Sequence, residues 1–187
     1  MKKFIVCVMS LVLSGCFFST KNSSFYVLES QQPAEVLNVK TSLAIENIRL
    51  PDYLQKPQIV LQKSDSPELK ISEFNRWASD LEDMVQNTLI EDLEAIAPKA
   101  DIKPLAYGIK TRYVIKINIE KMSGYFKEEA VLKGTYYILA SSGQLLKQSD
   151  FELKTDCGKN YADYVMAQST LVAQLAEQLI KALPRGV

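Results

Sequence analysis

The stretch EFNRWASDLEDMVQNTLIEDLEAIAP, residues 73–98, predicts an amphipathic helix that must bury one face against a sheet. Ser79 with Glu82 fits a capping box, Asn75 fits a cap one turn earlier, and Pro98 ends the helix because proline lacks an N–H donor. The apolar side chains recur at helical spacing and form one face: Trp77, Leu81, Met84, Val85, Thr88, Leu89, Leu93 and Ile96.

Trp77 is the single tryptophan of the chain and stands at the expected start of this helix. We interpret Trp77, with Leu81 one turn later, as an anchor in the core, and an interface role for Trp77 is the alternative. The acidic side chains of the helix lie mostly off its apolar stripe, so we expect a solvated face and no metal site: Asp80, Glu82, Asp83, Glu91, Asp92 and Glu94.

A second amphipathic helix is predicted for NYADYVMAQSTLVAQLAEQLIKALP, residues 160–184, with Asn160 as its cap and Pro184 as its stop. Its apolar stripe consists of Val165, Val172, Leu175, Leu179 and Leu183. A spacing of this kind is typical of a helix that packs on a sheet.

Extended runs surround the two helices. The segment TRYVIKINIEKM alternates apolar and polar residues, which indicates a strand with one solvated face. A hairpin follows, with the turn SSGQ between its strands. We expect an α+β fold with a mostly antiparallel sheet and both helices on one face, in the order β-β-α-β-β-β-α, within a single domain of residues 42–187. The extended runs are residues 42–49, 58–63, about 102–107, 111–122, 129–140 and 145–156.

Composition excludes several classes of function. The 187 residues contain 22 basic and 22 acidic side chains and no basic run, so we expect no nucleic-acid partner. There is no histidine, which removes the commonest general base and metal ligand. Cys157 has no histidine to activate it and an acidic neighbour. We therefore expect a protein that is not an enzyme, with no metal and no cofactor.

The first residues, MKKFIVCVMSLVLSGCFF, have two lysines, an apolar run and then small residues before Cys16. This pattern predicts a signal peptide over residues 1–15 and a lipid on Cys16, because LSGC resembles the lipobox of bacterial lipoproteins. An ordinary signal peptide that is cut elsewhere is the alternative. Residues 16–41 would form a tether with a short aromatic strand at FYVL. Phe17 stands where inner-membrane lipoproteins usually carry aspartate, which favours the periplasmic face of the outer membrane.

The stretch LPDYLQKP, residues 50–57, separates two of the expected strands with a proline at each end. Proline cannot donate to a strand ladder, so each proline marks a strand end or a turn. We call residues 50–57 the corner, and we expect it to display Tyr53 and Leu54. It serves either as a docking surface or only as a tight connection.

The corner and the helix together carry a family resemblance. The run IENIRLPDYLQKPQIVLQKSD, followed by NRWASDLEDMVQNTLIEDL, resembles the PqiC-type auxiliary lipoproteins of intermembrane lipid-transport machines that contain MCE proteins. The lipobox, FYVL and the closing order of strands and helix extend this resemblance over the mature chain. The residues that carry it are Leu50, Pro51, Tyr53, Leu54, Pro57, Arg76, Trp77 and Leu81.

The resemblance implies a non-catalytic lipoprotein of the outer membrane that docks a periplasm-spanning MCE protein. It also implies a homo-oligomeric ring, with Pro51, Tyr53, Leu54 and Pro57 in contact with a subunit or partner. Two alternatives stay open at this point. One is a carrier that binds lipid itself, and the other is an accessory lipoprotein of another outer-membrane assembly complex.

Overall fold

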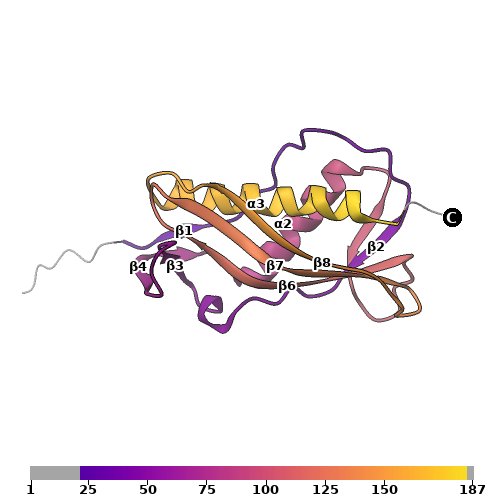
Figure 1. Ribbon diagram of the computed structural model, residues 1–187, viewed down its shortest axis with the longest axis horizontal. Coiled ribbons are helices and arrows are strands. Elements are labelled where there is room, and N and C mark those ends of the chain that lie inside the picture. Colours follow the sequence, from indigo (N-terminus) through magenta and orange to yellow (C-terminus); the bar gives the residue numbers. More distant parts are fainter. Residues whose placement is uncertain (1–21, 185–187) are drawn as a thin grey trace, which may run out of the picture.

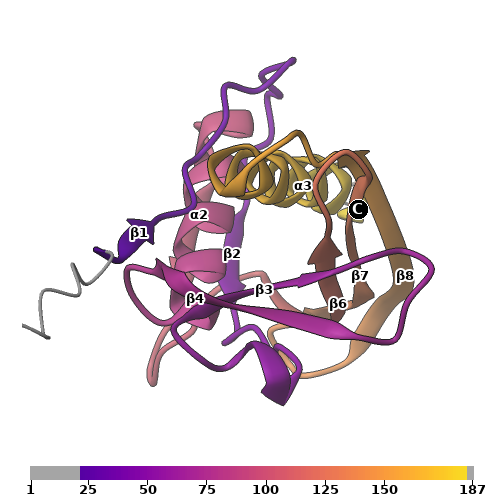
Figure 2. The same cartoon turned by 90° about the vertical axis from the view of Figure 1, so that its left-hand side faces the viewer.

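Helix α3 lies along the strands of a five-stranded sheet, and helix α2 packs beside α3 (Figures 1 and 2). The computed structural model describes residues 22–184; the expected signal peptide and the expected lipidation site Cys16 lie outside the described residues. The elements of the described part are β1 (Ser24–Tyr26), β2 (Ser42–Ile45), the 3-10 turn η1 (Asp52–Leu54), β3 (Gln58–Gln62), β4 (Leu69–Trp77), α2 (Leu81–Ile96), β5 (Asp101–Pro104), β6 (Tyr113–Gly124), β7 (Glu129–Ala140), β8 (Leu145–Asp156) and α3 (Tyr161–Ala182).

The α+β class is confirmed, but there are two sheets and both are mixed. The larger sheet has the order β5-β2-β6-β7-β8, with β2 parallel to β5 and β6 and the rest antiparallel. The smaller sheet has the order β1-β4-β3, with β1 parallel to β4. Parallel neighbours need a long crossover, and the chain between β2 and β5 supplies one through α2.

Strand β4 corrects the sequence prediction, which assigned Asn75 and Trp77 to the first helix. These residues pair instead with Ser24 and Tyr26 of β1, and Arg76 between them pairs with Gln58 of β3. Helix α2 begins one turn later, where the Asp80 carboxylate accepts the N–H groups of Glu82 at 2.9 Å and Asp83 at 3.3 Å. The proposed caps were therefore wrong: Asn75 lies in a strand, because strand pairing outweighs a local helical pattern, and Asp80 rather than Ser79 is the N-cap of α2.

The second helix and the hairpin follow the sequence prediction. Asn160 caps α3 by accepting the N–H of Asp163 at 3.0 Å, and the helix ends at Ala182, just before Pro184. Gly143 has φ of +85° in the turn between β7 and β8, a conformation that glycine adopts without strain. Neither helix of residues 22–184 has the length and apolar content that a bilayer crossing requires.

One core joins both sheets and both helices. Helix α2 covers the β5 end of the larger sheet, and α3 covers β7 and β8 (Figure 2). Trp77 at the end of β4 is 3% exposed, and its ring centroid lies 6.5 Å from that of Tyr164 in α3. Leu81 is also buried. Burial of side chains from β4, α2 and α3 in the same core fixes the smaller sheet against the helices.

Candidate functional site

The corner is a short 3-10 turn between β2 and β3 rather than a free loop. Pro51 has φ of −56° and ψ of 140°, and its carbonyl accepts the N–H of Leu54 at 2.9 Å. The Asp52 carbonyl accepts the N–H of Gln55 at 3.1 Å. Proline at the first position restricts the chain to the conformation that starts this turn.

The first turn of α2 holds the corner in place. Oε1 of Glu82 accepts the backbone N–H of Leu50 at 3.0 Å and the side-chain amide of Gln55 at 3.1 Å. At the other end of the corner, the backbone N–H of Trp77 donates to the Pro57 carbonyl at 2.7 Å. The corner is therefore attached to the β4–α2 junction at both ends, and its conformation is set before any partner binds.

Only some of the corner side chains that we expected at the surface are accessible. Leu54 is 3% exposed and belongs to the core, so its expected display on the surface was wrong: the 3-10 turn directs its side chain inward. Tyr53 and Pro51 are half-buried, and Pro57 is exposed. Burial also raises the pKa of the Tyr53 phenol, so the group stays neutral at physiological pH. Of the four predicted contact residues of the corner, Pro51, Tyr53 and Pro57 thus remain accessible.

The segment that follows β1 is attached to the helices, although the sequence suggested a polar tether there. The backbone N–H of Glu29 donates to Ser169 Oγ in α3 at 3.1 Å, and the N–H of Leu37 donates to the Ile96 carbonyl at the end of α2 at 2.7 Å. Between these points Asp92 Oδ1 accepts Ser30 Oγ at 2.7 Å. Within the described residues, the chain from β1 to β2 is therefore part of the folded domain.

Asp92 itself is 1% exposed, so its assignment to a solvated face was wrong. The backbone N–H of Gln31 gives its Oδ1 a second hydrogen bond, at 2.8 Å, while Oδ2 is buried without a hydrogen-bond partner in the described structure. Burial raises the pKa of this carboxyl, and the two hydrogen bonds partly oppose that rise. The carboxylate fastens the N-terminal segment to α2.

The environment of Cys157 disfavours a reactive thiolate. Cys157 is buried, and burial together with nearby Asp156, Asp163 and Glu128 raises the pKa of its thiol to about 11. A thiol in this state is a poor nucleophile. No group of three His, Cys, Asp or Glu side chains in this part of the chain could hold a metal ion.

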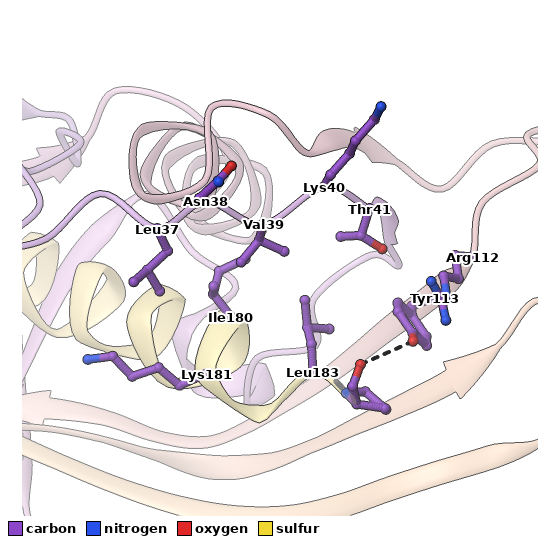
Figure 3. Close-up of a pocket in the computed structure, with 11 residues that line it drawn as sticks. Leu37, Asn38, Val39, Lys40, Thr41, Arg112, Tyr113, Ile180, Lys181 and Leu183 are labelled. Carbon is purple, nitrogen blue, oxygen red and sulfur yellow. Dashed lines mark hydrogen bonds between the residues drawn. The ribbon is translucent and has the colours of Figure 1, made fainter. Parts of the chain in front are cut away.

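Sequence reasoning missed a pocket of about 510 Å³ at the C-terminal end of α3 (Figure 3). No local motif reveals it, because its lining comes from three segments that only the fold brings together. The lining residues are Leu37, Asn38, Val39, Lys40, Thr41, Arg112, Tyr113, Ile180, Lys181, Leu183 and Pro184.

The chain is similar in sequence to two curated proteins and in fold to two solved structures. The chain is 27% identical over 151 residues to the intermembrane transport lipoprotein PqiC of Escherichia coli (strain K12), an alignment that covers 79% of each chain, and the Shigella flexneri protein of that name matches equally. A crystal structure of an uncharacterised protein has a TM-score of 0.71 at 24% identity and covers 86% of this chain and 98% of its own. A second, from Xanthomonas campestris, has a TM-score of 0.67 at 17% identity and covers 84% and 93%.

Both crystal structures share the fold of this chain. The decisive match is to a family profile, since it spans residues 26–180, from β1 to the last turn of α3. This chain belongs to the family of ABC-type transport auxiliary lipoprotein components.

Proposed function

We propose that this protein is an outer-membrane lipoprotein that docks the end of a periplasm-spanning MCE protein and so completes a route for lipid between the two membranes. Membership of the auxiliary lipoprotein family carries the proposal, together with the name of the PqiC relatives as intermembrane transport lipoproteins. The protein contributes binding and position rather than catalysis, and it supports membrane integrity through the transport system that it completes.

The anchor in this proposal is acyl lipid on Cys16, at the periplasmic face of the outer membrane. Asn22, the first described residue, follows Cys16 by six residues, a span of at most about 20 Å when extended. The end of the domain around β1 therefore stays close to the bilayer. Phe25, Val27 and Met166 are exposed at that end and line one shallow pocket, an apolar surface suited to lie against lipid.

The corner provides the docking surface of the proposal, through Pro51, Tyr53 and Pro57. Glu82 and the backbone of Trp77 hold these residues in one conformation, so little ordering entropy is lost when a partner binds. Leu54 supports the corner from the core. A tyrosine between two prolines is a rigid, amphipathic contact of the kind that often dominates an interface.

Several copies of the chain would form a ring around the end of the MCE protein. Strand β8 supports such an assembly, because it is an edge strand of twelve residues with exposed Leu145 and Leu146. A long edge strand offers unpaired backbone groups to a neighbouring copy.

Purification of the tagged chain from membranes tests the proposal. We expect an MCE protein to co-purify with the parent, and its recovery to fall at least tenfold with Tyr53→Ala combined with Pro57→Ala. Lys159→Gln, which removes an exposed charge at the start of α3, is the matched control. Full recovery of the MCE protein with the double variant would exclude the corner as the docking surface. If no MCE protein co-purifies with the parent, the proposed docking function is wrong.

Anchoring is tested separately with Cys16→Ala. We expect this variant to leave the membrane fraction and remain folded, because the folded domain begins after the anchor. Membrane association of the variant that resists alkaline carbonate would contradict the lipid anchor.

A further inference from the structure

We propose that the pocket at the C-terminal end of α3 binds an anionic amphiphile, with its carboxylate or phosphate at a cationic rim and its acyl chain on an apolar floor. We call this the α3 pocket; its lining residues are those shown in Figure 3. The inference goes beyond the docking role, because it assigns a ligand to the domain itself.

Charge is the first observation. The lining contains three cations, Lys40, Arg112 and Lys181, and no acidic side chain. This local excess stands out in a chain whose 22 basic and 22 acidic residues balance. Lys181 pairs with Glu177 at 3.3 Å, whereas the ion pairs of the described residues include neither Lys40 nor Arg112. Two cations therefore remain available to an anion.

Of the three cations at the rim, Arg112 is oriented by a neighbouring ring, whereas Lys40 and Lys181 have long, flexible side chains. The Arg112 guanidinium lies 5.4 Å from the centroid of the Tyr113 ring, a cation–π contact that orients it. The Tyr113 hydroxyl in turn donates to the Pro184 carbonyl at 3.4 Å (Figure 3). Lys40 and Lys181 extend outward on different sides of the pocket (Figure 3). Their long, flexible side chains would turn toward an anion at its opening.

The floor is apolar and belongs to the core. Tyr113, Ile180 and Leu183 are buried, and Leu37 and Val39 pack against the core from the segment before β2. A volume of about 510 Å³ falls in the range of small-molecule sites, roughly 300 to 1,000 Å³. Apolar contact of an acyl chain with this floor would remove it from water.

An unpartnered hydroxyl gives a second, independent observation. Thr41 lines the pocket, and its Oγ1 atom is buried without a hydrogen-bond partner in the described structure. A buried polar group without a partner costs about 1 to 3 kcal/mol. An oxygen of a bound carboxylate or phosphate would accept its proton and remove that cost.

These features select an amphiphile over simpler ligands. A bare anion would leave the half-buried Leu37 and Val39 in contact with water, and a neutral apolar ligand would leave the cations and Thr41 without partners. The C-terminal end of α3 contributes a partial charge of only about −0.5, against the positive charges of Lys40 and Arg112, which have no ion-pair partner in the described structure. The net field therefore favours an anion.

The pocket lies at the opposite end of α3 from strand β1. Tyr26 of β1 packs beside Tyr161 at the start of α3, whereas Ile180 and Lys181 line the pocket at its end. A helix of 22 residues is about 33 Å long. A ligand in this pocket is thus held well away from the end that the anchor keeps near the bilayer, and it is also separate from the corner.

Calorimetric titration of the mature chain with Cys16→Ala tests the inference, with single-chain probes below their micelle-forming concentrations. We expect dodecanoate or dodecyl phosphate to bind. Tighter binding of dodecanoate would identify a fatty acid as the source, and tighter binding of dodecyl phosphate would identify a phospholipid head. Equal binding of inorganic phosphate, or of dodecyl maltoside, would overturn the inference, as would no binding of either anionic probe.

Variants of the lining residues test whether the probe binds in the α3 pocket. We expect Lys40→Gln combined with Arg112→Gln to weaken binding at least tenfold, and Val39→Ser to weaken it without changing the response to salt. Lys159→Gln, at the other end of α3, should bind like the parent. Unchanged binding in the double variant, with its thermal midpoint intact, would place the ligand elsewhere and overturn the assignment. Recovery of the MCE protein is measured separately, so failure of one proposal leaves the other standing.

Discussion

Glu82 and Leu50 are joined by a hydrogen bond of 3.0 Å from the Leu50 N–H to Oε1 of Glu82, across 32 residues of sequence. The sequence suggested that Glu82 would cap its own helix, but Asp80 does so, and Glu82 is free to hold the corner. This contact links the candidate docking surface to α2.

Replacement of Glu82 should release the corner. We expect Glu82→Ala to cost about 1.5 to 3 kcal/mol of unfolding free energy, because two donors lose a charged acceptor. Glu82→Gln keeps an acceptor oxygen and should lose less than half as much. Urea unfolding measures both, and hydrogen exchange at Leu50 should accelerate in the alanine variant. Equal losses of stability in the two variants would show that the Glu82 carboxylate does not hold the corner.

Leu54 and Tyr53 should behave differently although they are neighbours. Leu54→Ala removes a fully buried side chain, and we expect a loss of about 2 to 5 kcal/mol. Tyr53→Ala removes a half-buried ring, so it should cost clearly less stability, while it should weaken capture of the proposed MCE partner. Thermal unfolding and pull-down measure the two effects. Greater destabilisation by Tyr53→Ala than by Leu54→Ala would show that the ring mainly closes the core.

Trp77→Ala should destabilise the domain by about 3 kcal/mol or more, because it leaves a large cavity beside Tyr164. Trp77→Phe fills part of that space and is the matched control, with a smaller loss. Equilibrium unfolding in urea gives both values. If Trp77→Ala unfolds like the parent and only assembly fails, Trp77 acts at an interface instead.

Asp92 should make the domain less stable as the pH rises. Burial raises its pKa in the folded state above the unfolded value of about 3.9, so the folded state binds the proton more tightly. Its contribution to stability therefore increases as the pH falls through the folded pKa and is complete below the unfolded pKa. Asp92→Asn keeps an oxygen for Ser30 and Gln31 but cannot ionise.

The thermal midpoint of this variant relative to the parent should accordingly be highest near pH 8 and should decline toward pH 4. A relative midpoint that rises on acidification would mean that the folded state prefers the charged carboxylate.

Cys157 should resist thiol reagents in the folded protein. A pKa raised to about 11 from an ordinary 9.0 lowers the thiolate fraction about 100-fold near pH 8, and burial blocks access as well. Disulfide-exchange reagents should therefore label Cys157 only after denaturant is added, which can be followed by absorbance in the Cys16→Ala variant. Rapid labelling of the native protein would show that the surrounding strands open.

The parts of the fold that local pattern specifies were predictable. Alternation identified β6, and apolar spacing with Asn160 identified α3. Strand β4 was missed because Trp77 continues the helical pattern of α2, while the pairing that makes it a strand comes from β1 and β3, remote in sequence.

Contacts between segments remote in sequence also explain the features of the candidate sites that the sequence did not predict. The burial of Asp92 depends on Ser30, 62 residues away, so no periodicity within α2 could reveal it. The α3 pocket joins residues 37–41 to Arg112 and the end of α3, and each segment alone reads as an ordinary polar stretch or helix end. The corner was predictable as a proline-bounded turn, but the inward direction of Leu54 depends on how that turn docks on α2.

Strand β1 has a mechanical consequence. It pairs in parallel with β4 over Ser24–Tyr26, and the Ala78 N–H adds a bond to the Tyr26 carbonyl. Tension applied to the N-terminal segment along the strand direction loads these hydrogen bonds in shear, so they must break together rather than one at a time. Strand β4 continues into Trp77 and α2, which passes the load directly into the core. A short strand can thus transmit a pulling force from the proposed lipid anchor to the whole domain without peeling away from it.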